Sequence, residues 1–180
     1  MQPARAATAI GAITTAAVRC AAAAVSAALV TALGVALTGL ADETRAALAF
    51  GFEGVDRSPR EATVIALHNA KIAGAVLLCA ALAPRLTQRV RCSVGLVLAI
   101  VLALNAAAIG LAIGAYGTRA LRALAPHAPP ELTGLSLTGG AYMHARQQPL
   151  SPLVLTGVGC TSAALLVVAA VLETYAGGTP

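Results

Sequence analysis

The sequence has no tryptophan and little charge. Asp, Glu, Lys and Arg together make up 11% of its 180 residues, and the only lysine is Lys71. There is also no long polar stretch that could fold as a separate water-soluble domain. Hydrophobic residues instead make up 58% of the chain, and the mean hydropathy is +0.83, well above that of a soluble domain. The composition therefore predicts a single helical unit embedded in a membrane.

The common catalytic motifs are missing as well. The chain has no G-x-S-x-G, no H-E-x-x-H and no phosphate-binding loop. Its four cysteines show no C-x-x-C and no metal-ligand spacing, and are interpreted as small buried residues (Cys20, Cys79, Cys92 and Cys160). The net charge of +5 concerns membrane topology and anionic lipid rather than nucleic acid. We therefore expect a non-enzymatic protein with no cofactor and no nucleic-acid partner.

Long apolar runs predict an all-α, polytopic bundle of about five membrane helices. A spanning helix needs roughly 20 apolar residues. The predicted spans are residues 20–40, 62–82, 93–117, 131–145 and 152–175, in one domain covering residues 20–175.

The first span has a competing interpretation as a cleaved signal peptide, because Arg5 and Arg19 precede it. We favour a span, since a signal's apolar core is usually about 7–15 residues long and further spans come after it. Residues 1–19 either extend this helix backwards or form a cytoplasmic surface segment. Residues 176–180 form a short tail.

The arginines predict the orientation. Arg85, Arg89 and Arg91 lie in one short turn, which the positive-inside tendency places in the cytoplasm together with the N-terminus. Residues 41–61 hold most of the acidic residues and both phenylalanines, and we expect an extramembrane connector resting on the interface. The predicted location is a bacterial inner membrane.

The stretch APHAPPELTGLSLTGG, residues 125–140, predicts an unusual fourth helix. Pro129 and Pro130 suit a helix start, and Glu131 complements the positive end of the helix dipole. The segment 131–145 covers only about 22 Å, against a hydrocarbon core of about 30 Å, so it either crosses while tilted or re-enters. We favour crossing, because Arg146 then lies inside and the tail, which has no basic residue, lies outside.

Four polar side chains interrupt the apolar spans: His68, Asn69 and Lys71 in the second, and Asn105 in the third. We expect the asparagines to bond between helices, with Asn105 reaching the second span. Lys71 should extend to the outer interface or pair with an acid, and Glu131 is the best-placed one. The alternative is a polar path for an ion or proton.

Small residues predict close helix contacts. Ala106, Gly110 and Gly114 form a stripe, which favours packing inside the bundle over dimerisation. Gly134, Gly139 and Gly140 give the short helix the same property.

No metal site is expected. His127 and Glu131 are four residues apart, but the two prolines between them make a continuous helix unfavourable. Nothing in the sequence fixes the distance to His68 or His144.

These residues resemble the stage II sporulation protein M family of bacterial and archaeal membrane proteins over roughly residues 62–175. The shared features are Asn69 with Lys71 after it, Asn105 followed by Gly110, and a Pro-His run leading to Glu-Leu before a glycine-rich short helix. That last motif reads Pro126, His127, Ala128, Pro129, Pro130, Glu131, Leu132. The family usually has glycine directly after the histidine, where this chain has Ala128.

The resemblance implies a membrane scaffold or anchor. The founding member works with peptidoglycan hydrolases in wall remodelling during sporulation, while relatives also occur in organisms that do not sporulate. We therefore expect a scaffold for membrane or envelope partners, in contact with lipid and able to form a homo-oligomer. The alternative is a permease-like subunit working with an ATPase, and neighbouring genes would distinguish the two.

Overall fold

The computed structural model describes residues 3–49 and 56–176, and all regular structure in these ranges is helical. This confirms the all-α class. The elements are α1 (Pro3–Thr38), α2 (Ala41–Leu48), α3 (Pro59–Leu82), the 3-10 turn η1 (Ala83–Arg85), α4 (Gln88–Tyr116), α5 (Thr118–Leu124), α6 (Ala128–Ala145) and α7 (Pro152–Ala176). Phe50, Phe52 and Glu53 of the predicted connector lie outside the described residues.

Four of the described helices are long and apolar enough to cross a membrane, which makes the chain a multi-pass membrane protein. They cover Ala6–Thr38, Pro59–Arg85, Gln88–Tyr116 and Pro152–Ala176. Residues 3–19 continue directly into the first predicted span. The 36 residues of α1 therefore form one helix about 54 Å long, well beyond the roughly 30 Å of a hydrocarbon core.

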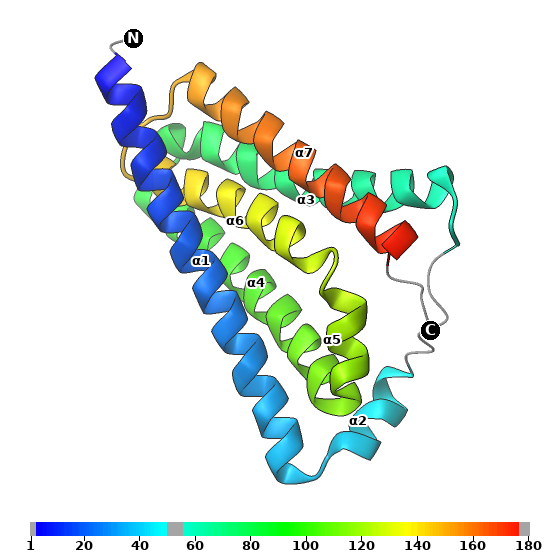
Figure 1. Ribbon diagram of the computed structural model, residues 1–180. Coiled ribbons are helices and arrows are strands. Elements are labelled where there is room, and N and C mark those ends of the chain that lie inside the picture. Colours follow the sequence, from blue (N-terminus) through cyan, green and yellow to red (C-terminus); the bar gives the residue numbers. More distant parts are fainter. Residues whose placement is uncertain (1–2, 50–55, 177–180) are drawn as a thin grey trace.

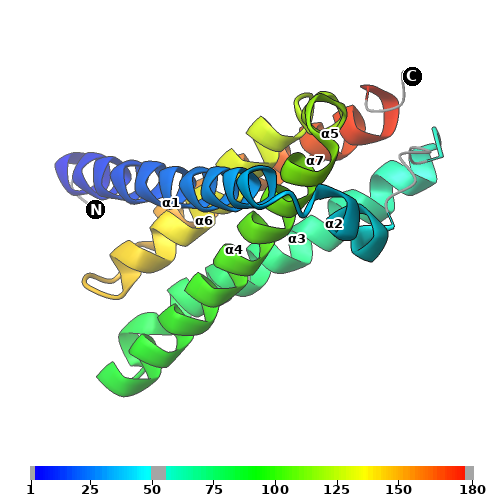
Figure 2. The ribbon, with the colours of Figure 1, turned by 90° about the horizontal axis from the view of Figure 1, so that it is seen from below.

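The helices form two diverging pairs with one helix between them (Figure 1). α1 packs on α4, α3 packs on α7, and α6 contacts α1, α3 and α7. Viewed from below, α1 runs at an angle to α3 and α4 (Figure 2). Because α6 has neighbours on three sides, it is the helix around which the bundle is built.

Small side chains allow α1 and α4 to approach closely. A Cβ added at Gly114 would lie 2.8 Å from the Ala32 carbonyl oxygen, and one added at Gly110 would meet the Ala28 carbonyl. The facing stripe of α1 contains the buried residues Ala28 and Ala32. The small-residue stripe of α4 thus lies inside the bundle, against α1, and is not free for a dimer contact.

The short helix α2 follows α1 and packs on α4. The Tyr116 hydroxyl at the end of α4 donates to the Arg45 carbonyl at 3.3 Å, and an Arg45–Asp42 ion pair of 2.7 Å stays within α2. This part of the predicted connector therefore lies over the end of the α1–α4 pair.

Gly117 makes the turn that sends the chain back into the bundle. Its φ of +57° is in the region that favours glycine. α5 then leads away from the end of α4, and α6 begins set back from the ends of α1 and α4 (Figure 1). With 18 residues, α6 is about 27 Å long, close to but below the core thickness.

The sequence predicts about five membrane helices, but α6 is not among the four described helices that are long and apolar enough to cross a membrane. The chain enters α6 from α5 and leaves it beside the α3–α4 turn, where the Tyr142 hydroxyl donates to the Arg91 carbonyl at 2.8 Å. Tyr142 itself is buried, with 1% of its surface exposed.

We predict that the end carrying the α3–α4 turn faces the cytoplasm, because Arg85, Arg89, Arg91 and Arg146 all lie there. In a variant that keeps Cys92, which is exposed at this end, as its single cysteine, an impermeant maleimide should leave Cys92 unmodified in intact cells. It should modify Cys92 once the cells are permeabilised. A cysteine-free chain carrying Thr118→Cys, near the opposite end, is the matched control and should react from outside. The reverse labelling pattern would show that the protein has the opposite orientation in the membrane.

Candidate functional site: a polar cluster at the start of α6

The start of α6 is built to lie inside the bundle. A helix start leaves four N–H groups without helical partners, here those of residues 127–130. The His127 N–H donates to the Leu124 carbonyl at 3.2 Å, and Pro129 and Pro130 have no N–H. Only the Ala128 N–H remains to be satisfied, so the two prolines make it less costly to set this helix start back from the membrane surface.

Glu131 stands in the first turn of α6 and faces α3 and α7. Asn69 of α3 is its side-chain hydrogen-bond partner, and His68, His127 and Glu173 lie within electrostatic range of its carboxyl group. We call these five residues the polar cluster. They come from α3, α7 and the start of α6, so the cluster ties three helices together near one end of the bundle.

The members of the polar cluster differ in burial. Asn69 is 7% exposed, His127, Glu131 and Glu173 are partly buried, and His68 is exposed. The Nδ1 atom of His127 is buried without a hydrogen-bond partner. Two carboxyl groups and two imidazoles at the edge of a bundle core provide several sites for a proton.

The expected Lys71–Glu131 ion pair is wrong. Lys71 is exposed, has no acidic group within ion-pair distance in the described part of the chain, and is not among the groups that act on Glu131. Residues two apart on a helix are about 200° apart around its axis. Because Asn69 faces α6, Lys71 lies on the opposite face of α3.

The expected contact of Asn105 with another helix is also wrong. Its side-chain amide donates to the Val101 carbonyl of its own helix at 2.8 Å, and the residue is exposed. α4 packs mainly on α1 through the stripe of Ala106 and Gly110, so Asn105 is turned away from that contact.

Several other expected residues pack around α6. Pro126 is partly buried before the helix. Gly134 faces α7, where a Cβ would lie 3.2 Å from the Ser162 carbonyl oxygen, whereas a Cβ at Gly139 would meet only the Cys20 sulfur, at 3.7 Å. His144 is partly buried at the far end of α6, away from the polar cluster.

Sequence reasoning missed two contributors. The Ser162 hydroxyl, 0% exposed, donates to the Gly134 carbonyl at 2.7 Å and joins α7 to α6. Glu173 joins the polar cluster from the end of α7. An acidic residue near the end of an otherwise apolar span is the signal that identifies Glu173, while serine in a membrane helix is too common to single out Ser162.

No group of three or more His, Cys, Asp or Glu in the described ranges is placed to hold a metal ion. With its own atoms, the polar cluster can hold helices together through hydrogen bonds and can take up or release protons.

Comparison with family models, curated proteins and solved structures finds no match for this chain.

Proposed function

We propose that the protein is a non-enzymatic membrane scaffold that binds a transmembrane helix of a partner protein along the outer face of α3. The observation that carries this proposal is Lys71, an exposed lysine near the middle of α3. The setting of cell-envelope or peptidoglycan remodelling is part of the proposal and rests on the resemblance to the stage II sporulation protein M family.

The position of Lys71 supports a partner. It lies about 17 Å from either end of α3, so its stem alone does not bring the amine comfortably to an interface. Ionisable groups at such depth almost always face a bundle interior or pair with another group. The residues around it on the same face are apolar and exposed, including Leu67 and Leu78.

The chemistry of this surface selects the partner. An ammonium group surrounded by apolar side chains is complemented by an apolar helix with one carboxylate at matching depth. The described acids of this chain do not provide it, because Glu131 and Glu173 face the bundle. The partner we propose is thus a different membrane protein with an Asp or Glu inside its span.

The test is a charge exchange across the contact. A photo-crosslinking residue at position 67, on the same face, should capture a membrane protein, and Lys71→Asp should lower the yield at least tenfold because it opposes two like charges. Changing the partner's intramembrane acid to lysine should restore the cross-link to Lys71→Asp. Yields are measured on membranes from cells that express each combination.

Asn105→Leu is the matched control, since it also removes an exposed polar group in mid-span, but on α4. It should leave the cross-link at position 67 unchanged. An unchanged yield with Lys71→Asp would contradict the proposal. A cross-link to a second copy of this chain alone would replace the scaffold with a homo-oligomer.

A permease-like subunit is the second candidate, and the polar cluster is the observation that favours it. Two carboxyl groups and two imidazoles near one end of the bundle resemble the proton-handling groups of transporters. An ATPase that co-purifies with the protein, or a proton-coupled flux lost in Glu131→Gln but retained in Lys71→Met, would support transport over the scaffold.

A further inference from the structure

We infer that the end of the bundle where α4 begins and α6 ends holds the phosphodiester headgroup of an anionic phospholipid. The residues that would bind it are Arg146, Gln88 and Gln147, with the charge of Arg91 beside them. This site is on a different part of the molecule from the polar cluster and from the outer face of α3, and it does not depend on the proposed scaffold function.

The two arginines are fixed close together by the fold. Arg91, in the first turn of α4, donates from Nη1 to the Arg146 carbonyl at 2.8 Å. The Arg91 carbonyl in turn accepts from the buried Tyr142 hydroxyl at 2.8 Å. Since Tyr142 and Arg146 belong to the same end of α6, the two bonds fix the Arg91 guanidinium and the Arg146 backbone at the α4–α6 junction.

Neither guanidinium has an anionic partner among the residues that the structure describes. The Nε atom of Arg91 is buried without a hydrogen-bond partner. Within the described part of the chain, the Arg146 guanidinium donates to sulfur, with Nη2 3.7 Å from the Cys92 Sγ and Nη1 3.9 Å from the Met143 Sδ, and sulfur is a weak acceptor. The Arg146 donors therefore retain most of their capacity for a strong acceptor, and Arg91 adds an uncompensated positive charge beside them.

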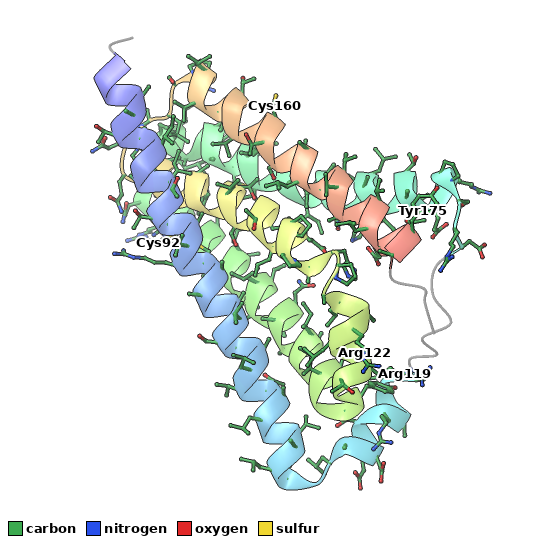
Figure 3. The ribbon with its side chains drawn as sticks, viewed as in Figure 1. Cys92, Arg119, Arg122, Cys160 and Tyr175 are labelled. Atoms are coloured by element: carbon green, nitrogen blue, oxygen red, sulfur yellow. The ribbon has the colours of Figure 1, made fainter. Side chains whose placement is uncertain are left out.

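No acid at this end competes for them. All acidic residues in the described ranges belong to segments at the opposite end of the bundle. They are Asp42, Glu43, Asp56, Glu61, Glu131 and Glu173. The end with the α4–α6 junction instead carries Arg85, Arg89, Arg91 and Arg146. Figure 3 labels Cys92 at this junction, far from Arg119 and Arg122 on α5. The local field is positive and unneutralised by the described residues.

The junction also has space for a headgroup. A cavity of about 370 Å³ opens between Gln88, Met143, Arg146 and Gln147. One turn along α4 from Cys92, Leu96 is 62% exposed, and Met143 beside the cavity is 42% exposed. A phosphate at the arginines would place acyl chains against these apolar side chains.

The expected place of this site at the inner leaflet, where lipid phosphodiesters are the abundant anions, points to a phosphodiester. Guanidinium groups match the geometry of phosphate oxygens with paired N–H donors, and the glutamine amides add neutral donors. Basic pockets between membrane helices at the cytoplasmic side are suited to anionic headgroups. The expected orientation places this end of the bundle at that leaflet.

The experiment measures lipid binding to the full chain by native mass spectrometry and by melting temperature in mixed micelles. The probes are phosphatidylglycerol, phosphatidylcholine and inorganic phosphate. Phosphatidylglycerol should bind and raise the melting temperature, phosphatidylcholine much less. Arg146→Gln and Arg91→Gln should each weaken phosphatidylglycerol binding about fivefold or more, the factor expected for one basic residue at an anionic lipid surface.

Arg122→Gln, which removes the same charge from α5 at the other end, should leave binding unchanged. Arg146→Lys keeps the charge but loses the paired donors, and should fall between the wild type and Arg146→Gln; it also covers the case in which Arg91→Gln fails to fold. Equal binding of both lipids, or an equal loss in Arg122→Gln, would overturn the proposal. So would inorganic phosphate that competes at the affinity of the lipid, because the ligand would then be a free anion.

Discussion

Gly140→Ala should destabilise the bundle by about 1–3 kcal/mol or more, the range for an added methyl group in a well-packed core. A Cβ at Gly140 would lie 2.5 Å from the Ile13 carbonyl oxygen and 2.9 Å from the Ala17 backbone nitrogen. Both obstacles are backbone atoms of α1, so no side-chain rotation relieves them and the two helices must separate. The free energy of unfolding can be measured by denaturant titration in mixed micelles followed by pulse proteolysis.

The neighbouring glycine provides the control. In Gly139→Ala, the nearest atom of a neighbouring helix to the new Cβ is the Cys20 sulfur, at 3.7 Å, which is an ordinary contact. Because alanine is also the better helix former, this variant should be as stable as the wild type or slightly more so. Equal losses at both positions would show that α6 is sensitive to any change at its glycines and that the contact with α1 is not the cause.

The overall architecture could be predicted from sequence because hydrophobic length alone selects spanning helices. The predicted segments match the helices α3, α4, α6 and α7 to within about five residues. Of these, α3, α4 and α7 are long and apolar enough to span, whereas α6, which contains the 131–145 segment, is not among the candidate spans. Of the two alternatives for residues 1–19, the structure has the backward extension of the first helix, which begins at Pro3. Residues 3–19 are less apolar than residues 20–38, yet alanine and threonine continue the helix from Pro3 without a break.

Helix facing is where sequence reasoning is insufficient. Asn69 and Lys71 lie on opposite faces of α3, so the sequence predicts that only one of them faces the bundle, but it does not say which one. Charge alone favours Lys71 as the residue that faces the Glu131 carboxylate. The structure places Asn69 there, because an amide bonds to a carboxyl group at a smaller desolvation cost than a second buried charge.

Asn105 shows the same limit for helix neighbours. α3 and α4 are consecutive in the chain, which favours a contact between them. The alanine stripe of α1 instead draws α4 onto α1, since Gly110 and Gly114 permit the closest approach there. A stripe in the sequence shows which face is buried, but not which helix covers it.

A double-mutant cycle should separate Asn69 from Lys71 as the partner of Glu131. Asn69→Leu leaves the Glu131 carboxyl without its amide, and Glu131→Leu leaves the buried amide without its acceptor, so each single change carries a desolvation cost of about 1–3 kcal/mol. The double variant loses the pair together. The double variant should therefore lose less unfolding free energy than the two single variants together, by about 1–2 kcal/mol. This coupling is in the upper range of polar contacts between membrane helices.

The matched cycle combines Lys71→Met with Glu131→Leu. Lys71 lies on the outer face of α3, whereas Glu131 lies on α6 and faces the bundle. Their losses of unfolding free energy should add within about 0.5 kcal/mol, as they do for independent sites. Both cycles use the same denaturant titration in mixed micelles. If the coupling appeared between Lys71 and Glu131 and not between Asn69 and Glu131, α3 would have to be rotated by about half a turn from its position in this fold. The outer face proposed for a partner helix would then be the face that covers α6.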